Sequence, residues 1–323
     1  MKAIMYTEYG LPDVLHLEEV DKPTPKDNEV LIKVKASSVN DWDWGLLRAK
    51  PFVNRLSNGL FKPKKIQILG ADVAGQVESV GVKVKQFKPG DEVFGDLCQC
   101  GFGCFAEYVC APENALTLKP GSMSFEQAAA VPQAGLLALR GLRKGKIRQG
   151  QKVLINGASG GAGSFAVQMA KSFGAEVTGV CRTGKLEFVK SLGADKVIDF
   201  QQEDFTKNGQ FYDLILDMMA FHSIFDYKCV LSPKGVYIAE GGSMPRIFQV
   251  LMLGPLISII EGKKMSLLIH KPNKNLAEVI ALIEAGKIIP AIDKCYPLSE
   301  AAKAMRYFGE GHKKGKIVIT MEG

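Results

Sequence analysis

Residues 153–167 have the sequence VLINGASGGAGSFAV, with glycines at positions 157, 160 and 163 between two apolar segments. This pattern predicts a strand, a tight turn and the start of a helix. Glycines in such a turn let the backbone approach a diphosphate, whose charge the helix N–H groups and dipole attract. The spacing is GxxGxxG rather than GxGxxG, but the physical requirement is the same. The alternative is a glycine-rich turn that binds nothing. We expect a dinucleotide cradle formed by Gly157, Ser159, Gly160, Gly161, Ala162 and Gly163.

The next predicted strand, residues 176–181, indicates which dinucleotide binds. Sites for NAD usually place Asp or Glu at its end to bind the ribose hydroxyls. Here the strand ends at Cys181, and Arg182 and Lys185 follow in place of a carboxylate. The helix dipole disfavours two exposed cations at a helix start, which makes an anionic partner more attractive. We therefore predict NADPH as the cofactor, bound near Cys181, Arg182 and Lys185.

The order of predicted elements gives the fold class. Strands are expected at 152–156, 176–181, 196–199, 212–217, 235–240 and 265–270, and helices at 163–173, 185–192, 223–231 and 275–285. This alternation is typical of a doubly wound parallel sheet. The first third instead has short β segments at 30–36, 70–81 and 87–94, which favour a compact barrel. We expect a loop with a short helical turn over 42–63, helices over 124–144 and 299–308, and a last strand at 315–320 that returns to the barrel.

Length and composition limit the class of protein. The chain has 323 residues, 46% hydrophobic and 23% charged, with a net charge of +7. These values fit a soluble protein of about two domains and exclude collagen-like and disordered chains. The basic clusters at 62–65 and 312–314 are short and indicate solvated loops, so no nucleic-acid partner is expected. The longest apolar run, 247–260, is shorter than the ~20 residues that span a bilayer, so we expect a buried helix and no transmembrane segment.

The cysteines indicate the redox compartment. Their number, seven, is odd, and the first residues lack the apolar core of a secretory signal. We expect free thiols and a cytoplasmic location. Cys98, Cys100, Cys104 and Cys110 lie with gaps of one, three and five residues. Because this spacing does not match the paired C-x2-C pattern, a structural zinc site is the minority interpretation.

Several segments together resemble the medium-chain dehydrogenase/reductase superfamily, and within it the zinc-independent quinone oxidoreductase branch. They are ASSVNDWD at 36–43, the glycine-flanked strand at 70–81, PGDEV at 89–93, FAEYV at 105–109, the cradle at 157–163, LGADKVID at 192–199 and GKIV at 315–318. The resemblance covers nearly the whole chain. It implies an α/β protein with a GroES-like β-barrel domain formed by residues 1–122 and 287–323 and a Rossmann NADPH-binding domain at 123–286. It also implies a homodimer joined through the edge of the Rossmann sheet.

The same resemblance bears on a catalytic metal. Zinc-dependent members carry Cys at the position of Asn40 and a His-Glu pair at Ala71-Asp72. Asparagine and alanine cannot supply the thiolate and imidazole ligands that such a site needs, so we expect no catalytic metal. Alcohol oxidation then lacks its Lewis acid, whereas hydride transfer to a conjugated electrophile remains accessible. The expected activity is NADPH-dependent reduction of a quinone or an α,β-unsaturated carbonyl.

The candidate site residues follow from this resemblance. Asn40 and Asp43 are the candidate catalytic residues, although an Asn-x-x-Asp sequence is more often a turn or helix cap. Trp42, Trp44 and Phe52 are expected to line a flat substrate or, equally, to pack between domains. Phe200, which replaces the family's usual tyrosine, is expected at the cofactor together with Gly241, Gly242 and Lys316.

Two alternatives stay open. Because no general acid or base is recognisable, the chain can be a non-catalytic NADPH-binding or interaction protein. It can also be an alcohol or aldehyde oxidoreductase of the same superfamily, for which bound metal is the discriminating observation.

Overall fold

The computed structural model describes residues 1–321 and divides into two units. Unit 1 comprises Met1–Gln133, Pro272–Leu276 and the described residues from Ile292 onward, and unit 2 comprises Ala134–Lys271 and Ala277–Ala291. The chain therefore leaves the first unit at Gln133, eleven residues later than the boundary at 122 expected from the sequence. Unit 2 is inserted within unit 1.

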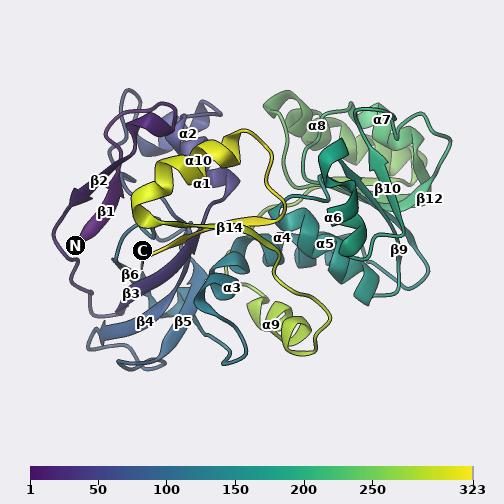
Figure 1. Ribbon diagram of the computed structural model, residues 1–323. Helices are drawn as coiled ribbons and strands as arrows, with labels where there is room; N and C mark the ends of the chain where they lie inside the picture. The colour runs from purple at the N-terminus through teal and green to yellow at the C-terminus, as the bar shows by residue number, and fades with distance from the viewer. Residues whose placement is uncertain (322–323) are drawn as a thin grey trace. The chain divides into compact units, whose positions relative to one another are not determined.

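Unit 2 is built on a six-stranded parallel sheet (Figure 1). Its strands are β8 (Lys152–Asn156), β9 (Glu176–Cys181), β10 (Lys196–Asp199), β11 (Tyr212–Asp217), β12 (Leu231–Ala239) and β13 (Lys264–Leu267). They lie in the order β10-β9-β8-β11-β12-β13, in which the chain winds outward in both directions from β8. The doubly wound fold is confirmed.

The helices of unit 2 lie before, between and after the strands of this sheet along the chain. They are α4 (Pro132–Lys144, whose first two residues belong to unit 1), α5 (Gly161–Ser172), α6 (Leu186–Ser191), α7 (Ile224–Cys229), α8 (Met244–Glu261) and α9 (Leu276–Glu284). The sheet is buried by apolar side chains, and Tyr227 of α7 stacks on Tyr237 of β12 with ring centroids 4.5 Å apart. The burial of both sheet faces explains why these strands read as continuous apolar runs.

Unit 1 contains a seven-stranded sheet of β3 (Glu29–Ser38), β4 (Asp72–Val80), β5 (Glu92–Asp96), β6 (Tyr108–Pro112), β7 (Thr117–Leu118), β14 (Ile292–Pro297) and β15 (Lys316–Thr320). The strands β1 (Lys2–Met5) and β2 (His16–Glu19) form a separate antiparallel pair, and α10 (Ala301–Gly309) precedes β15. β15 pairs antiparallel with β3, with Val318 opposite Ser38. The last strand thus returns to the first domain, as predicted.

Three local expectations were wrong. The loop expected at 42–63 contains two helices, α1 (Asp41–Leu47) and α2 (Val53–Asn58), the first of which starts in a capping box between Asn40 and Asp43. The single helix expected at 124–144 is divided into α3 (Phe125–Ala130) and α4, because Pro132 has no N–H to continue the hydrogen-bond ladder. The apolar run at 247–260 is helical but largely exposed rather than buried.

Candidate active site

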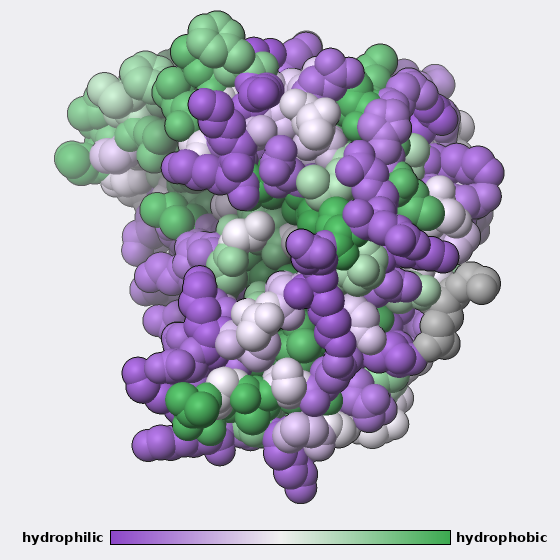
Figure 2. Space-filling model, turned by 90° about the vertical axis from the view of Figure 1, so that its left-hand side faces the viewer, coloured by the Kyte–Doolittle hydropathy of each residue, from purple (hydrophilic) through white to green (hydrophobic). Residues whose placement is uncertain are grey.

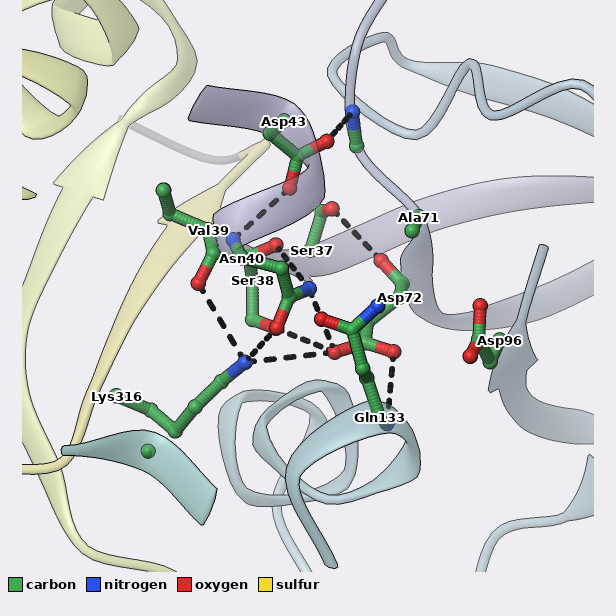
Figure 3. Close-up of polar contacts among 12 residues, drawn as sticks. Ser37, Ser38, Val39, Asn40, Asp43, Ala71, Asp72, Asp96, Gln133 and Lys316 are labelled. Atoms are coloured by element: carbon green, nitrogen blue, oxygen red, sulfur yellow. Dashed lines mark hydrogen bonds and ion pairs between the residues drawn. The ribbon is translucent and has the colours of Figure 1, made fainter. Parts of the chain in front are cut away.

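Unit 1 holds a buried polar network where β3 ends (Figure 3). Its centre is the amide of Asn40. The Asn40 Nδ2 donates to Asp72 Oδ2 at 3.0 Å and to the Ser38 carbonyl at 3.2 Å, and its Oδ1 accepts from Lys316 Nζ at 2.5 Å. The amide is therefore held between a carboxylate and an ammonium, and both of its ends are used.

Asp72, the first residue of β4, is fully buried and receives hydrogen bonds from three groups besides the Lys316 ammonium. Ser38 Oγ and Asn40 Nδ2 donate to Oδ2 at 2.7 and 3.0 Å, and the Gln133 N–H donates to Oδ1 at 3.1 Å. Desolvation raises the pKa of Asp72, and the charge of Lys316 opposes that rise. The donors and the ammonium together compensate a carboxylate that has no access to water.

Lys316, the first residue of β15, is 3% exposed. Besides Asn40 Oδ1, its ammonium lies 3.5 Å from Asp72 Oδ2 and 3.5 Å from the Val39 carbonyl oxygen. Because β15 pairs with β3, the strand places this cation beside the turn at Val39 and Asn40. A lysine this deeply buried needs a partner of opposite charge, and Asp72 supplies it.

Asp43 lies one helical turn into α1 and is also fully buried. Its two carboxylate oxygens accept the N–H groups of Asn40 at 2.9 Å and Gly70 at 2.8 Å. Burial raises its pKa to about 7, and these two hydrogen bonds limit the rise. The geometry is that of a residue that positions Asn40. Its assignment as a catalytic group stays a prediction.

The three aromatic residues expected to line the substrate lie in different environments. Trp44 packs against Phe308 of α10, with ring centroids 6.4 Å apart, and the Arg48 guanidinium lies over its ring. Trp42 and Phe52 are both exposed, on α1 and at the start of α2. Trp44 is therefore partly buried against the core of unit 1, and the substrate-lining assignment stays a prediction for all three residues.

The glycine turn of unit 2 connects β8 to α5 as predicted. Gly157 has φ of +86°, a backbone conformation that favours glycine, and its N–H and that of Ala158 donate to the Val180 carbonyl of β9. At Gly163 an added Cβ would overlap the Gly157 carbonyl oxygen and lie 2.8 Å from Ala158 Cα. Gly160, the N-cap of α5, has no side chain that could cap the first N–H groups of the helix. The first-turn N–H groups of α5 thus keep room for an anion.

The residues predicted to determine the selectivity for NADPH lie at the carboxyl ends of β9 and β10. Cys181 is buried at the end of β9, Arg182 is exposed and Lys185 is partly exposed after it. Phe200 is exposed beyond β10, and its N–H donates to the Cys181 carbonyl at 3.2 Å. The structure therefore brings these four residues to one edge of the sheet.

Sequence reasoning missed a carboxylate at this edge. Asp199, the last residue of β10, accepts from the Thr183 hydroxyl and from the Gln201 N–H. Both of its oxygens are thus engaged by neighbouring protein groups. The signal was its place at the end of the third strand, beside Phe200.

The carboxyl ends of β11 and β12 carry further polar groups that the sequence did not single out. Asp217 is buried; its Oδ1 accepts from Asn156 Nδ2 and from the Met219 and Ala220 N–H groups, and its Oδ2 accepts from the Tyr237 hydroxyl at 2.9 Å. This carboxylate fixes the loop after β11. Gly242, with φ of +135°, packs so closely on that loop that a Cβ would overlap Ala220. The glycines at 241 and 242 thus have a packing role beside their predicted cofactor role.

Glu240 follows β12, and its two carboxyl oxygens are buried without a hydrogen-bond partner among residues 1–321. Desolvation raises its pKa well above the usual value, while the nearby charge of Arg140 opposes the rise. Burial therefore favours the protonated form of this carboxyl group.

All seven cysteines are free thiols. Of the four near residue 100, Cys98 and Cys104 are buried, Cys100 is exposed and Cys110 lies on β6. Cys104 Sγ lies 3.7 Å from the Ala71 carbonyl oxygen, to which it donates. Within the described residues, no three of these four thiols are close enough to share one metal ion.

A mostly antiparallel β domain and a doubly wound sheet with a glycine turn before its first connecting helix define a two-domain, nucleotide-dependent dehydrogenase or reductase. Residues 26–121 match the family model described as alcohol dehydrogenase GroES-like domain, and residues 192–319 match the one described as zinc-binding dehydrogenase. The chain belongs to the medium-chain dehydrogenase/reductase superfamily, in its quinone oxidoreductase-like branch.

Individual relatives agree with this assignment. The chain is 34% identical over 337 residues to the chloroplast envelope quinone oxidoreductase homolog of Arabidopsis thaliana, covering 99% of this chain and 98% of the relative. It is 33% identical to the NADPH-dependent alkenal/one oxidoreductase of the same plant, covering 99% and 79%. The solved quinone oxidoreductase from Coxiella burnetii is similar with a TM-score of 0.88 and 31% identity, covering 100% and 99%.

Proposed function

We propose that the protein is an NADPH-dependent, zinc-independent reductase that transfers hydride to a quinone or an α,β-unsaturated carbonyl. The named activities of its relatives, quinone and alkenal/one oxidoreductases, support this substrate class. The observation that carries the zinc-independent part is the network of Asn40, Asp72 and Lys316. It puts a buried ammonium beside the residue that replaces the cysteine ligand of zinc-dependent members.

The residues of unit 2 fit a bound dinucleotide. Gly157 and Gly163 keep the turn free of side chains, and the uncapped start of α5 offers N–H groups to a diphosphate. Arg182 and Lys185 follow β9, where an adenosine 2′-phosphate is expected. When bound, NADPH supplies the hydride.

Unit 1 contributes charge rather than a metal. A conjugated carbonyl or quinone that accepts hydride at carbon gains negative charge on its oxygen until a proton reaches it. A fixed positive charge near that oxygen lowers the barrier, because it is already oriented when the charge develops. Lys316 supplies such a charge, Asn40 and Asp72 hold it in place, and Asp43 fixes the turn that carries Asn40.

The competing functions predict different measurements. An alcohol or aldehyde oxidoreductase that uses zinc would contain about one equivalent of metal after purification and would lose activity to a chelator. A non-catalytic NADPH-binding protein would bind the cofactor without oxidising it. We expect neither result, because the position of the zinc-ligand cysteine is occupied by Asn40 and its amide is bonded to a lysine.

The test of the proposed function combines a substrate screen with a cofactor variant. Oxidation of NADPH is followed with quinones, enones and enals, and we expect turnover with at least one class. Arg182→Glu/Lys185→Glu is expected to weaken NADPH binding by about 100-fold or more while changing NADH binding little. Lys152→Glu/Lys234→Glu, which makes the same charge change elsewhere on unit 2, is the control. Absence of turnover with every class, or equal losses for both cofactors, would contradict the proposal.

We also propose that the protein works in a reducing compartment such as the cytoplasm and forms a homodimer along the edge of β13. Seven free thiols support the first statement. The position of β13 at the end of the parallel sheet, with one side unpaired among residues 1–321, supports the second. Analytical ultracentrifugation tests the dimer.

A further inference from the structure

Helix α8 presents a continuous apolar stripe to solvent. Seven large apolar side chains are between 51% and 82% exposed: Met244, Phe248, Leu251, Met252, Leu256, Ile259 and Ile260. Their spacing of three to four residues puts them on one side of the helix. Soluble proteins rarely leave so large a contiguous apolar surface without a partner. Figure 2 shows that hydrophobic residues also gather on one part of the face that it presents, while hydrophilic ones cover most of the remainder.

The opposite side of α8 is packed into unit 2. Val250, Gly254 and Ile257 are buried, and an added Cβ at Gly254 would lie 2.5 Å from the Met265 carbonyl oxygen of β13. By length and composition α8 is long and apolar enough to cross a bilayer. Its close contact with β13 instead makes it part of the folded unit. The stripe is therefore a surface that lies against a partner.

The charges at the two ends of α8 indicate the chemistry of that partner. Between residues 241 and 271 the sequence has one carboxylate, Glu261, and its Oε1 pairs with Lys228 Nζ at 2.8 Å. Arg246 lies in the first turn of the helix, where its guanidinium also donates to the Phe221 carbonyl and to Gln249 Oε1. After the Gly262 cap come Lys263, whose ammonium also donates to the Lys228 carbonyl, and the exposed Lys264. An apolar stripe with cations at both ends is the pattern of a helix that lies in the interface of an anionic membrane.

Unit 1 carries a second surface of the same kind, formed by residues 50–65. This segment contains five lysines and arginines and no carboxylate. Phe52, Val53, Leu56, Leu60 and Phe61 are all exposed. Buried Asn58 anchors this segment to the rest of unit 1. Its Nδ2 donates to the Tyr6 hydroxyl and the Ile66 carbonyl, and its Oδ1 accepts from the Lys65 and Ile66 N–H groups. The outward position of these apolar side chains is thus set by the fold.

We propose that each of these two surfaces docks on an anionic lipid bilayer, by inserting its apolar side chains between the headgroups while its lysines bind lipid phosphates. A second copy of the chain fits the α8 stripe less well. Two-fold symmetry brings the same surface together, so cations at the ends of α8 would face cations with no free carboxylate opposite. Within the chain, the stripe lies on the side of α8 opposite the residues that pack against β13.

The experiment is vesicle co-sedimentation of the full chain. Vesicles of phosphatidylcholine are compared with vesicles in which about one third of the lipid is phosphatidylglycerol, at about 0.1 M and about 0.5 M salt. We expect binding to the anionic vesicles to be at least about 10-fold tighter, and to weaken by a similar factor at the higher salt.

Variants test each surface separately. Ile259→Glu/Ile260→Glu and Lys263→Glu/Lys264→Glu change α8, and Lys64→Glu/Lys65→Glu changes the 50–65 segment. Each is expected to lower anionic vesicle binding by about 10-fold or more, since each lysine near a membrane contributes a several-fold effect. The apolar control is Ile289→Glu, exposed on unit 2, and the charge control is Lys33→Glu/Lys234→Glu. Both controls are expected to bind like the unchanged protein.

Three results would overturn the proposal. The first is equal binding to both vesicle types, and the second is loss of binding in the controls but not in the α8 and 50–65 variants. The third is a dimer that Ile259→Glu/Ile260→Glu converts to a monomer with vesicle binding unchanged, which would identify a second copy as the partner. Because the changed side chains other than Lys263 are exposed, thermal unfolding of the variants without a change at Lys263 is expected to match that of the unchanged protein.

Discussion

Replacement of Lys316 by methionine tests the buried network most directly. Removing one member of a buried ion pair typically costs 3–5 kcal/mol, because the remaining charge is uncompensated. The cost here is expected near the lower end, about 3 kcal/mol. The ammonium lies 3.5 Å from Asp72 Oδ2, and the carboxylate keeps its donors Ser38, Asn40 and the Gln133 N–H. The methionine side chain retains much of the lost apolar contact.

The loss should depend on pH in a defined direction. The pKa of Asp72 is already raised by burial, and Lys316 limits that rise. Without the ammonium the folded form holds the proton more tightly than the unfolded chain does, so stability falls as pH rises above the ordinary carboxyl pKa. At pH values low enough to protonate the folded carboxyl, only the hydrogen bond to Asn40 is missing, a loss of about 1 kcal/mol. The difference should grow to about 3 kcal/mol by pH 8.

The assay is urea unfolding followed by tryptophan fluorescence at several pH values. Both tryptophans of the chain, Trp42 and Trp44, lie in unit 1, so their emission reports the unit that contains the network. The double variant Lys316→Met/Asp72→Asn removes both charges and should recover part of the loss and its pH dependence. If Lys316→Met lowers the free energy of unfolding by less than about 0.5 kcal/mol, or by an amount that does not change with pH, the compensating role of Lys316 is refuted.

Two glycine variants separate folding from cofactor binding. Gly163→Ala is expected to destabilise unit 2 by about 1–3 kcal/mol, because its Cβ overlaps the Gly157 carbonyl oxygen. Gly160→Ala should leave the unfolding midpoint unchanged, because its Cβ would meet only the Gly157 carbonyl oxygen, at 3.4 Å. It should still weaken NADPH binding, because the added Cβ extends into the cradle. An NADPH affinity equal to that of the unchanged protein in a titration would contradict the cradle. Glu240→Gln should weaken the dependence of the free energy of unfolding on pH. The raised pKa of Glu240, only partly opposed by Arg140, makes the unchanged protein lose up to about 1.4 kcal/mol per pH unit above the ordinary carboxyl pKa. An unaltered slope in thermal melts would show that Glu240 ionises freely.

The sheet of unit 2 was predictable from sequence because its strands are buried on both faces. Four of its six strands, at 152–156, 176–181, 196–199 and 212–217, have the bounds that the apolar runs indicate. Such runs are bounded by turn residues and leave little ambiguity. The strands of unit 1 were harder to predict: β14 at Ile292–Pro297 carries mostly polar and partly exposed residues and was missed. Its position is set by pairing with β15, which local sequence does not record.

The candidate site was only partly predictable for the same reason. The sequence placed Asn40 and the glycine turn correctly on their elements, because local capping and turn chemistry determine both. It did not indicate that Lys316 lies against Asn40, since 276 residues separate them and only the β3–β15 pairing brings them together. The partners of Asp217 and the isolation of Glu240 likewise depend on tertiary packing.

The insertion of unit 2 within unit 1 sets an order of folding during synthesis. The parallel sheet is complete once residue 267 has left the ribosome, whereas the strand that carries Lys316 is among the last parts of the sheet of unit 1 to be made. A nascent chain is therefore expected to fold the nucleotide-binding unit first, at a stage when Asp72 still lacks its ion pair with Lys316. Until residue 320 emerges, the edge of β3 that pairs with β15 stays unpaired in the nascent chain. A chaperone would therefore be most useful at this stage of translation.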